Sequence, residues 1–165
     1  MNKKIAVCPG SYDPITVGHI DIIDRASDLF DFVYVLVCNN SEKKYIFDMK
    51  TRVDFCKRVF FGRKDIEVIS CSGLVTEEYK KLGACAVVKG VRNSADYVYE
   101  AELSGINAMM GEKMETVFLP AKSENLYVSS KVVREFGKYG GDISGIVPEC
   151  IVDDISKILF KENPV

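Results

Sequence analysis

The sequence predicts an α/β fold, with a mainly parallel sheet of five strands flanked by helices in one domain of 165 residues. Short runs rich in β-branched residues alternate with longer stretches in which apolar residues recur at helical spacing. No linker, internal repeat or low-complexity stretch divides the chain. These two observations together favour a single α/β unit over separate domains.

The expected strands are apolar runs too short for helices. Buried strands that alternate with helices are typical of an open, Rossmann-like sheet, in which the strands run mainly parallel. The first run ends at Pro9-Gly10, a turn signal. The expected strands cover residues 5–8, 32–38, 66–70, 86–88 and 116–119.

The expected helices follow from apolar spacing and from capping residues. Asp48 stands where an N-cap is expected, and Gly140-Gly141 provides a stop signal for the fifth helix. Pro148 begins a last helix whose apolar residues, among them Ile151 and Ile155, share one face. The expected helices cover residues 20–30, 49–60, 75–82, 96–110, 129–139 and 148–159.

Composition and charge exclude several classes of protein. Hydrophobic residues make up 47% of the chain and charged residues 28%, which is typical of a globular protein and not of a disordered one. The net charge of −2 and the pI near 5.5 give no overall basic field, so nucleic acid and anionic membrane surfaces are not favoured partners. No apolar segment is long enough to predict a membrane span.

The six cysteines are scattered, without a CxxC pair. Cys8, Cys38, Cys56 and Cys85 lie in apolar runs that resemble strands or helix faces. We expect buried free thiols in a reducing cytoplasm, with disulfides or a metal site as the alternative.

Polar residues follow each predicted strand, at the edge where parallel α/β sheets bind ligands. Five separate polar clusters at the same edge of a sheet are hard to attribute to chance. The clusters are Ser11, Asp13 and His19, then Asn39, Asn40 and Lys43, then Ser72 and Gly73, then Lys89 to Arg92, and finally Ser129-Ser130 one loop after the fifth strand.

His19 is the only histidine, and it lies where a helix begins after a buried strand. Backbone N–H groups face outward at such a helix start and bind anions, which points to a phosphate-bearing ligand. The helix start also lowers the imidazole pKa, so a neutral hydrogen-bond donor is expected. A surface or capping histidine is the alternative. Neither G-x-x-x-x-G-K-[ST] nor G-x-G-x-x-G occurs in the chain, which excludes the common phosphate-binding loops.

Further candidates carry positive charge or hydroxyl groups. In Lys89-Gly90-Val91-Arg92 a cation ends an apolar strand and a second follows, which would aim an ammonium and a planar guanidinium at a phosphate. Lys43 and Lys44 on their own would be read as solvated surface. Ser129-Ser130 is either a helix N-cap or a phosphate seat, and the sequence leaves both open.

The acidic residues do not form a recognisable metal site. Asp13, Asp96, Glu100 and Glu102 lack the spacing of a metal cage. Asp96 and Glu100 would share a helix face, or Asp96 would cap the helix. Any Mg²⁺ is therefore expected to arrive with nucleotide phosphates and to keep most of its waters.

Three motifs carry a resemblance to a known family. They are Gly-Ser-Tyr-Asp-Pro-Ile-Thr-x-Gly-His at 10–19, Lys-Gly-x-Arg at 89–92 and Val-Ser-Ser at 128–130. With them the chain resembles the bacterial phosphopantetheine adenylyltransferases, of the nucleotidylyltransferase superfamily with its (T/H)xGH motif. The likeness runs almost end to end and includes Asp96-Tyr-x-Tyr-Glu100.

The resemblance implies one nucleotidylyltransferase (cytidylyltransferase-like) domain over residues 1–165. It implies reversible transfer of AMP from ATP to 4′-phosphopantetheine, which yields dephospho-coenzyme A and pyrophosphate with Mg²⁺ carried by ATP. It also implies a cytoplasmic homohexamer, built as a dimer of trimers.

Matching positions imply roles for individual residues. His19 would stabilise the transition state, and Lys43 would assist it. The acceptor phosphopantetheine would contact Ser11, Lys43, Val75 and Lys89. ATP would contact Ser11, Tyr12, His19, Gly90, Val91, Arg92, Glu100, Asn125, Leu126, Tyr127, Val128, Ser129, Ser130 and Lys131.

The chain departs from the family pattern at several of these positions. Lys89 stands where the family usually has arginine, so the charge stays but the bidentate grip is lost. Lys131 replaces a common serine or threonine, and Asn125 a bulkier residue, whereas Ser11 for threonine and Tyr12 for phenylalanine are mild changes. Two alternatives remain: a sister enzyme that adds AMP or CMP to another phosphorylated acceptor, and a nucleotide-binding module without catalysis.

Overall fold

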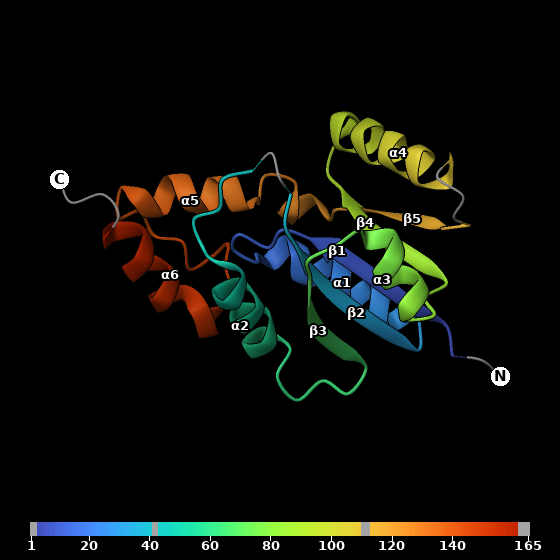
Figure 1. The fold of residues 1–165 in the computed structure, drawn as a ribbon. Helices are drawn as coiled ribbons and strands as arrows, with labels where there is room; N and C mark the ends of the chain where they lie inside the picture. Colours follow the sequence, from blue (N-terminus) through green and yellow to red (C-terminus); the bar gives the residue numbers. More distant parts are fainter. Residues whose placement is uncertain (1–2, 41–42, 110–112, 162–165) are drawn as a thin grey trace.

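A computed structural model describes residues 3–40, 43–109 and 113–161 of the chain. Its sheet has five strands in the order β3-β2-β1-β4-β5, and every neighbouring pair is parallel. The predicted α/β class and parallel sheet are therefore confirmed (Figure 1). The strands are β1 (Ile5–Gly10), β2 (Phe32–Cys38), β3 (Ile66–Cys71), β4 (Ala86–Val91) and β5 (Thr116–Pro120).

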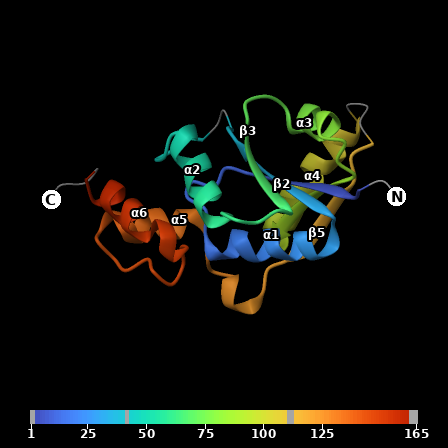
Figure 2. The ribbon, with the colours of Figure 1, turned by 90° about the horizontal axis from the view of Figure 1, so that it is seen from below.

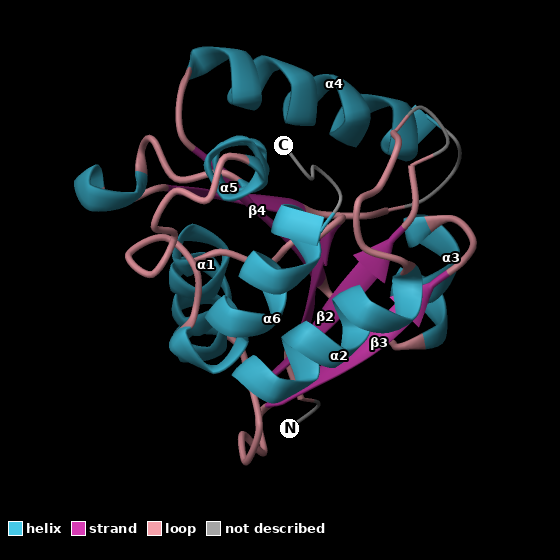
Figure 3. Ribbon diagram, turned by 90° about the vertical axis from the view of Figure 1, so that its left-hand side faces the viewer, coloured by secondary structure: helices cyan, strands magenta, loops and turns pink. Residues whose placement is uncertain are grey.

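Helices cover both faces of the sheet, as Figures 1 and 3 show. On one face α1 and α2 pack beside α5 and α6, and on the other lie α3 and α4 (Figure 2). The helices are α1 (Val17–Leu29), α2 (Met49–Val59), α3 (Val75–Lys81), α4 (Ser94–Met109), α5 (Ser130–Lys138) and α6 (Glu149–Lys161). A short 3₁₀ helix, η1 (Ser123–Asn125), was not expected from the sequence.

The strands are buried on both faces, which explains their near-continuous apolar sequences. Ala6 and Cys8 of β1 join the larger apolar cluster with α1, α2, α5 and α6. Val7 points the other way, into a smaller cluster under Tyr79 of α3. On α6, Ile151, Ile155 and Leu159 are fully buried, so the predicted apolar face of this helix is confirmed.

The strand order reverses between β1 and β4, and these two strands separate early. They pair only at Ala6–Ala86 and Val7–Val87, whereas β1 pairs with β2 along its whole length. Beyond Val7 the two strands no longer form a ladder, and a crevice opens between their carboxyl ends. Open α/β sheets bind their ligands at such a reversal point.

Four strands are longer than predicted: β3 and β5 by one residue each, β1 by two residues and β4 by three. β4 continues to Val91 because Lys89, Gly90 and Val91 pair with β5, so Lys89 lies within the strand and does not end it. β1 continues through Pro9, which pairs in register with Leu36 of β2. Proline lacks an N–H donor, and this central strand tolerates it because the ladder with β4 has already ended.

The cysteines are free, as predicted. Cys8, Cys56 and Cys71 are buried and Cys38 is partly buried. The predicted burial of Cys85 is wrong: this residue lies directly before the first residue of β4, at the amino ends of the strands, and is exposed. In the described residues, no helix combines the length and the apolar character that crossing a membrane requires.

Candidate active site

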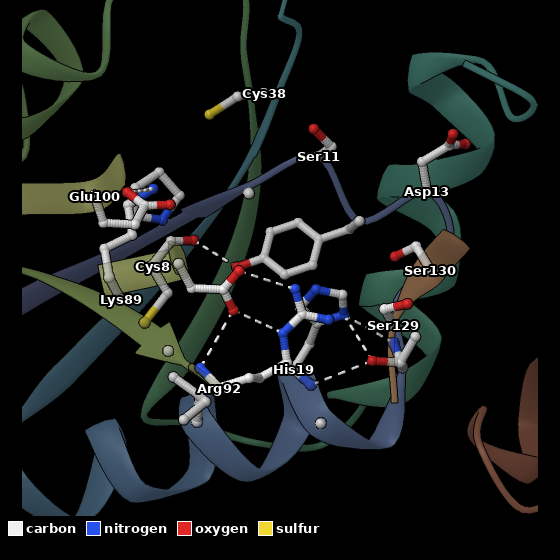
Figure 4. A pocket seen from close by; sticks show the side chains of 18 of the residues that line it. Cys8, Ser11, Asp13, His19, Cys38, Lys89, Arg92, Glu100, Ser129 and Ser130 are labelled. Carbon is white, nitrogen blue, oxygen red and sulfur yellow. Dashed lines mark hydrogen bonds and ion pairs between the residues drawn. The ribbon is translucent and has the colours of Figure 1, made fainter. Parts of the chain in front are cut away.

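A pocket of about 780 Å³ lies in the crevice between β1 and β4, a volume suited to a cofactor-sized ligand (Figure 4). It brings together most of the predicted clusters, from all parts of the chain. Of the residues singled out in the sequence, those lining it are Ser11, Tyr12, Asp13, His19, Asn39, Asn40, Lys43, Lys44, Val75, Lys89, Gly90, Arg92, Asp96, Glu100, Asn125, Val128, Ser129, Ser130 and Lys131.

Some predicted residues do not line this pocket. Val91 is absent from its wall, and so are Leu126 and Tyr127. Tyr127 is 88% exposed and Leu126 38%, and both come directly after η1. Their contacts with ATP, implied by resemblance, stay predictions. Ser72 and Gly73, after β3, also lie outside the pocket wall.

His19 lies in the first turn of α1 and takes part in a capping box with Thr16. The backbone N–H of Thr16 donates to Nδ1 of His19 over 3.0 Å. Nδ1 therefore presents a lone pair, and in the neutral ring the proton sits on Nε2. Nε2 of His19 is therefore a hydrogen-bond donor, because the start of the helix engages the lone pair of Nδ1.

The electrostatic surroundings of His19 keep its ring uncharged. Burial, and then the nearby charge of Arg92, lower the pKa of His19 from 6.5 to about 4. A neutral imidazole with its proton on Nε2 donates one hydrogen bond and does not exchange a proton near pH 7. Figure 4 shows this ring between Arg92 and Ser129.

Tyr12 supports the histidine ring from the end of β1. Its backbone is left-handed at φ 48°, and its hydroxyl donates to the carbonyl of Cys8 over 2.7 Å. Its ring meets His19 edge-on at 5.1 Å between centroids. Gly10 makes room for it, since a Cβ there would lie 2.8 Å from Cζ of Tyr12. Burial raises the pKa of Tyr12, so its hydroxyl stays protonated.

Arg92 is held in place by Asp96. Its Nε lies 2.8 Å from Oδ2 of Asp96, and its Nη1 donates to the carbonyl of Val128 over 3.4 Å. The hydrogen bonds from Arg92 lower the pKa of Asp96. Asp96 is therefore not the helix cap that the sequence allowed: α4 begins at Ser94, and Asn93 accepts the backbone N–H of Asp96.

Lys89 of β4 forms an ion pair with Glu100 of α4, with 3.1 Å between Nζ and Oε2. Lys89 also opposes the effect of burial on Cys8, whose thiol pKa is still raised to about 12. Cys8 is therefore a protonated thiol at neutral pH, unsuited to nucleophilic attack. By contrast, Lys43 and Lys131 have no ion pair with any carboxylate in the described ranges 3–40, 43–109 and 113–161.

Both serines at the start of α5 have hydrogen bonds. Ser129 is the N-cap, and its hydroxyl accepts the N–H of Val132. The hydroxyl of Ser130 donates to the carbonyl of Pro14 over 2.8 Å, which ties α5 to the loop after β1. The capping role is confirmed for Ser129, and the phosphate seat stays a prediction.

Asp13 was a candidate from the sequence without a predicted role, and Arg134 was missed altogether. Asp13 is almost fully buried and accepts the backbone N–H groups of Ile46 and Phe47. Arg134 of α5 lines the pocket and donates to the backbone carbonyl of Asp13. In the sequence, the available signals were the acidic residue before Pro14 and an arginine one helical turn after Ser130. Their pairing depends on the fold.

At Gly90, α1 packs tightly against the sheet. A Cβ at this position would lie 2.7 Å from Cγ1 of Ile22. The absence of a side chain therefore lets the helix that carries His19 pack directly against the strand that carries Lys89.

The described residues include no group of three or more histidine, cysteine or acidic side chains that could hold a metal ion. The pocket carboxylates Asp13, Asp96 and Glu100 each pair with a cation instead. That Mg²⁺ is carried by ATP stays a prediction.

A parallel sheet with a pocket at its reversal point, a neutral histidine at a helix start and converging cations define a nucleotidyl-transferring α/β protein. A family model described as cytidylyltransferase-like matches residues 7–136. Relatives named phosphopantetheine adenylyltransferase are 41% identical over 161 residues in Bifidobacterium longum, covering 96% of each chain, and 40% identical over 152 residues in Clostridium beijerinckii, covering 92% of this chain and 96% of the relative. The chain belongs to the phosphopantetheine adenylyltransferase family of cytidylyltransferase-like proteins.

Solved structures agree on the fold. The nicotinic acid mononucleotide adenylyltransferase of Plasmodium falciparum, complexed with NaAD, matches with a TM-score of 0.72 at 16% identity and covers 98% of each chain. A lipopolysaccharide core biosynthesis protein of Thermoplasma volcanium matches with a TM-score of 0.57 at 20% identity, over 74% of this chain and 100% of that one. At these identities the likeness concerns the fold alone.

Proposed function

We propose that this enzyme transfers AMP reversibly from ATP to 4′-phosphopantetheine and so makes dephospho-coenzyme A and pyrophosphate in coenzyme A biosynthesis. One observation carries the proposal. A neutral histidine and the cations of Lys43, Lys89 and Arg92 line one pocket at the reversal point of the sheet. Relatives across nearly the whole chain bear the name of this activity.

The reaction is a direct displacement at phosphorus. An oxygen of the acceptor phosphate attacks the α-phosphorus of ATP, and a new P–O bond forms. The bond from the α-phosphorus to the bridging oxygen breaks, and its electron pair leaves with pyrophosphate. The acceptor phosphate is already ionised at neutral pH, so no general base is needed. Catalysis then consists of positioning two anions and stabilising the charge on the equatorial oxygens.

His19 stabilises that charge as a donor. Its Nε2–H would point to a non-bridging oxygen of the α-phosphate, and the lone pair on Nδ1 stays engaged with Thr16. Because its pKa is lowered to about 4, the ring keeps this role throughout the physiological range. Mg²⁺ carried by ATP would neutralise charge on the phosphates.

The cations divide between the two substrates. Lys43 and Lys89 would hold the acceptor phosphate, with Ser11 beside them and Val75 along the pantetheine arm. Arg92, tied to Asp96 and to the carbonyl of Val128, would hold ATP phosphates together with the start of α5. Further ATP contacts would come from Gly90, Glu100 and residues 125–131.

We also propose that the enzyme is a cytoplasmic homohexamer. Free cysteines are typical of a reducing compartment. The exposed apolar residues of α4 support an assembly. Val98 and Ile106 are each 53% exposed and Met109 is 88% exposed. A surface helix of a monomer normally buries such residues against its own core, so a neighbouring subunit is expected to cover them. Sedimentation velocity of the purified protein tests the hexamer, and a monomer at micromolar concentration contradicts it.

The deciding experiment mixes the protein with ATP, Mg²⁺ and 4′-phosphopantetheine and detects dephospho-coenzyme A by mass spectrometry, with pyrophosphate release as a second readout. Parallel reactions offer nicotinamide mononucleotide, or glycerol 3-phosphate with CTP. We expect product from phosphopantetheine and ATP alone. Product only from another acceptor makes the chain a sister transferase, and ATP binding without any pyrophosphate release makes it a non-catalytic module.

A further inference from the structure

Arg52 of α2 is a buried cation with no anionic partner in the part of the chain that the structure describes. Its residue exposure is 1%, and it is among the largest fully buried side chains. No carboxylate of the described residues forms an ion pair with it. Burial of an uncompensated charge is costly, so a side chain in this state calls for a reason.

The guanidinium replaces water with hydrogen bonds to neutral oxygens. Nη1 donates to the carbonyl of Ser11 over 2.7 Å and to that of Cys38 over 3.0 Å. Nε donates to the carbonyl of Phe47 over 3.0 Å, and Nη2 donates to the side-chain oxygen of Asn39. Arg52 thus joins the end of β1, the end of β2 and the start of α2. Only a planar, multi-donor group spans such a set.

One further contact involves Tyr45. The Cζ atom of Arg52 lies 4.1 Å from the centroid of the Tyr45 ring, a cation–π contact. The Tyr45 hydroxyl is in turn hydrogen-bonded to the backbone N–H of Asn40. Residues 39, 40 and 43–47, here called the acceptor-side loop, therefore surround the guanidinium. The same loop carries Lys43 to the pocket.

The contacts are confined to one side of the pocket. The hydrogen-bonded partners are Ser11 directly after β1, Cys38 at the end of β2, and Asn39 and Phe47 of the acceptor-side loop. None comes from β4, α4 or α5, where Arg92 and Ser129 lie. The loop is also held by Asp13, which accepts the backbone N–H groups of Ile46 and Phe47 next to the carbonyl that Arg52 binds. Arg52 is therefore placed to affect the acceptor side of the pocket more than the ATP side, since only Ser11 among its hydrogen-bond partners is also an expected ATP contact.

We propose that Arg52 is a positioning residue that holds the acceptor-side loop, and with it Lys43, in the arrangement that binds the acceptor phosphate. Its buried charge adds a positive potential behind Ser11 and Asn39 that the acceptor's dianionic phosphate complements. This inference rests on the proposed function, because it names the acceptor as the phosphorylated substrate of that reaction. Arg52 touches neither substrate and acts through the loop.

The test compares R52K with a matched control on the same helix. Arg58 also belongs to α2, but it is exposed and pairs with Asp154 at the surface, so R58K makes the same chemical change away from the pocket. In R52K the charge remains and the planar fork is lost. We expect the KM for 4′-phosphopantetheine to rise ~10–100-fold, the range that loss of a few charge-assisted hydrogen bonds produces.

The same assay measures the KM for ATP, which we expect to stay within about twofold of the wild-type value in R52K. R58K should leave both KM values unchanged. An equal rise of both values in R52K, or no rise in either, overturns the positioning role. Should R52K fail to fold by circular dichroism, N39A removes one acceptor of the guanidinium and should raise the acceptor KM alone by ~3–10-fold. N39A with unaltered or equally altered KM values likewise overturns the proposal.

Calorimetric titration with 4′-phosphopantetheine separates this inference from the proposed function. A wild-type protein that makes no dephospho-coenzyme A contradicts the proposed function. In that case R52K must still bind 4′-phosphopantetheine more weakly than R58K does. Equal binding by the two variants overturns the inference, whatever the activity assay has shown.

Discussion

Helices α1 and α4 both follow a strand of the sheet and both supply polar groups to the pocket, but the chain treats them differently. α1 buries Ile22, Ile23 and Ala26 in the core. α4 buries no residue along its 16 positions and is joined to the pocket through the ion pairs of Asp96 and Glu100. The group that needs the tightest placement, His19, is thus on the helix that the core holds.

This difference teaches how precision is distributed in the site. A donor to a transition state loses its effect when it moves by a fraction of an ångström, and a well-packed helix prevents that movement. Charges that hold phosphates from farther away tolerate more movement. α4 can therefore depend on ion pairs and, in the assembly that we propose, on a neighbouring subunit.

The largest expected effect comes from removal of the donor on α1. H19A should lower kcat by ~10²–10³, the range for loss of one donor to a developing oxyanion, with a much smaller change in the KM for ATP. Steady-state kinetics with both substrates measure it, and a thermal unfolding scan confirms that the variant is folded. Turnover near the wild-type value would remove His19 from the mechanism.

A smaller effect is expected on the α4 side. D96N keeps the size of the side chain but removes the charge that orients Arg92, so the KM for ATP should rise ~5–20-fold while kcat falls less. E100Q is the comparison variant on the same helix. Lys89 loses its partner in E100Q, so the KM for the acceptor should rise in E100Q but not in D96N, whereas the KM for ATP should rise in both because Glu100 is itself an expected ATP contact. If the KM for the acceptor rises equally in both variants, the division of the pocket into two sides is wrong.

A further variant tests whether α4 depends on assembly. I106E places a charge in its exposed apolar face, and we expect smaller species in sedimentation velocity. Activity should fall only ~2–5-fold, because α4 then keeps its ion pairs with β4 but loses external support. F61E is the control, since Phe61 lies near the end of α2 and is 91% exposed. An unchanged sedimentation profile of I106E would exclude α4 from the interface.

The smallest effect concerns pH. The pKa of His19 is lowered to about 4, so the neutral donor persists as the pH falls, and kcat should stay level from about pH 8 down to about pH 5.5. The free energy of unfolding, unlike kcat, should depend on pH in this range. His19 binds a proton near pH 6.5 in the unfolded chain but not in the folded chain, so stability is lost as the pH falls from 6.5 towards 4. H19A should lack this loss in acid denaturation curves. A break in kcat near pH 6.5 that H19A abolishes would show a charged, proton-exchanging ring.

Much of the fold was predictable from local patterns. All five strands leave an apolar signal of their own, and their alternation with helices is sufficient for a parallel sheet. Strand ends were less predictable, because the extension of β4 to Val91 depends on pairing with β5. Cys85 was misjudged for a similar reason, since only the sheet shows that its side chain reaches the surface.

The site divides in the same way. His19 and Lys89 were predictable, because a histidine or a lysine close to the end of an apolar strand is a recognisable candidate for binding phosphate. Arg52 does not, because an arginine on an amphipathic helix is indistinguishable in sequence from a surface residue until β1 and β2 close over it. The partner of Asp96 was equally hidden, since a carboxylate in a first helical turn can cap, pair or bind solvent.

Gly90 limits how this active site can be altered. A methyl group at this position would come within 2.7 Å of Cγ1 of Ile22, so the side chain of Ile22, on the helix that carries His19, would have to shift. Attempts to evolve a new acceptor preference by randomising this strand therefore have one forbidden position in the middle of the useful ones. At position 89 the proposed function needs a cation to hold the acceptor phosphate, and at position 90 only glycine leaves Ile22 of α1 where it is.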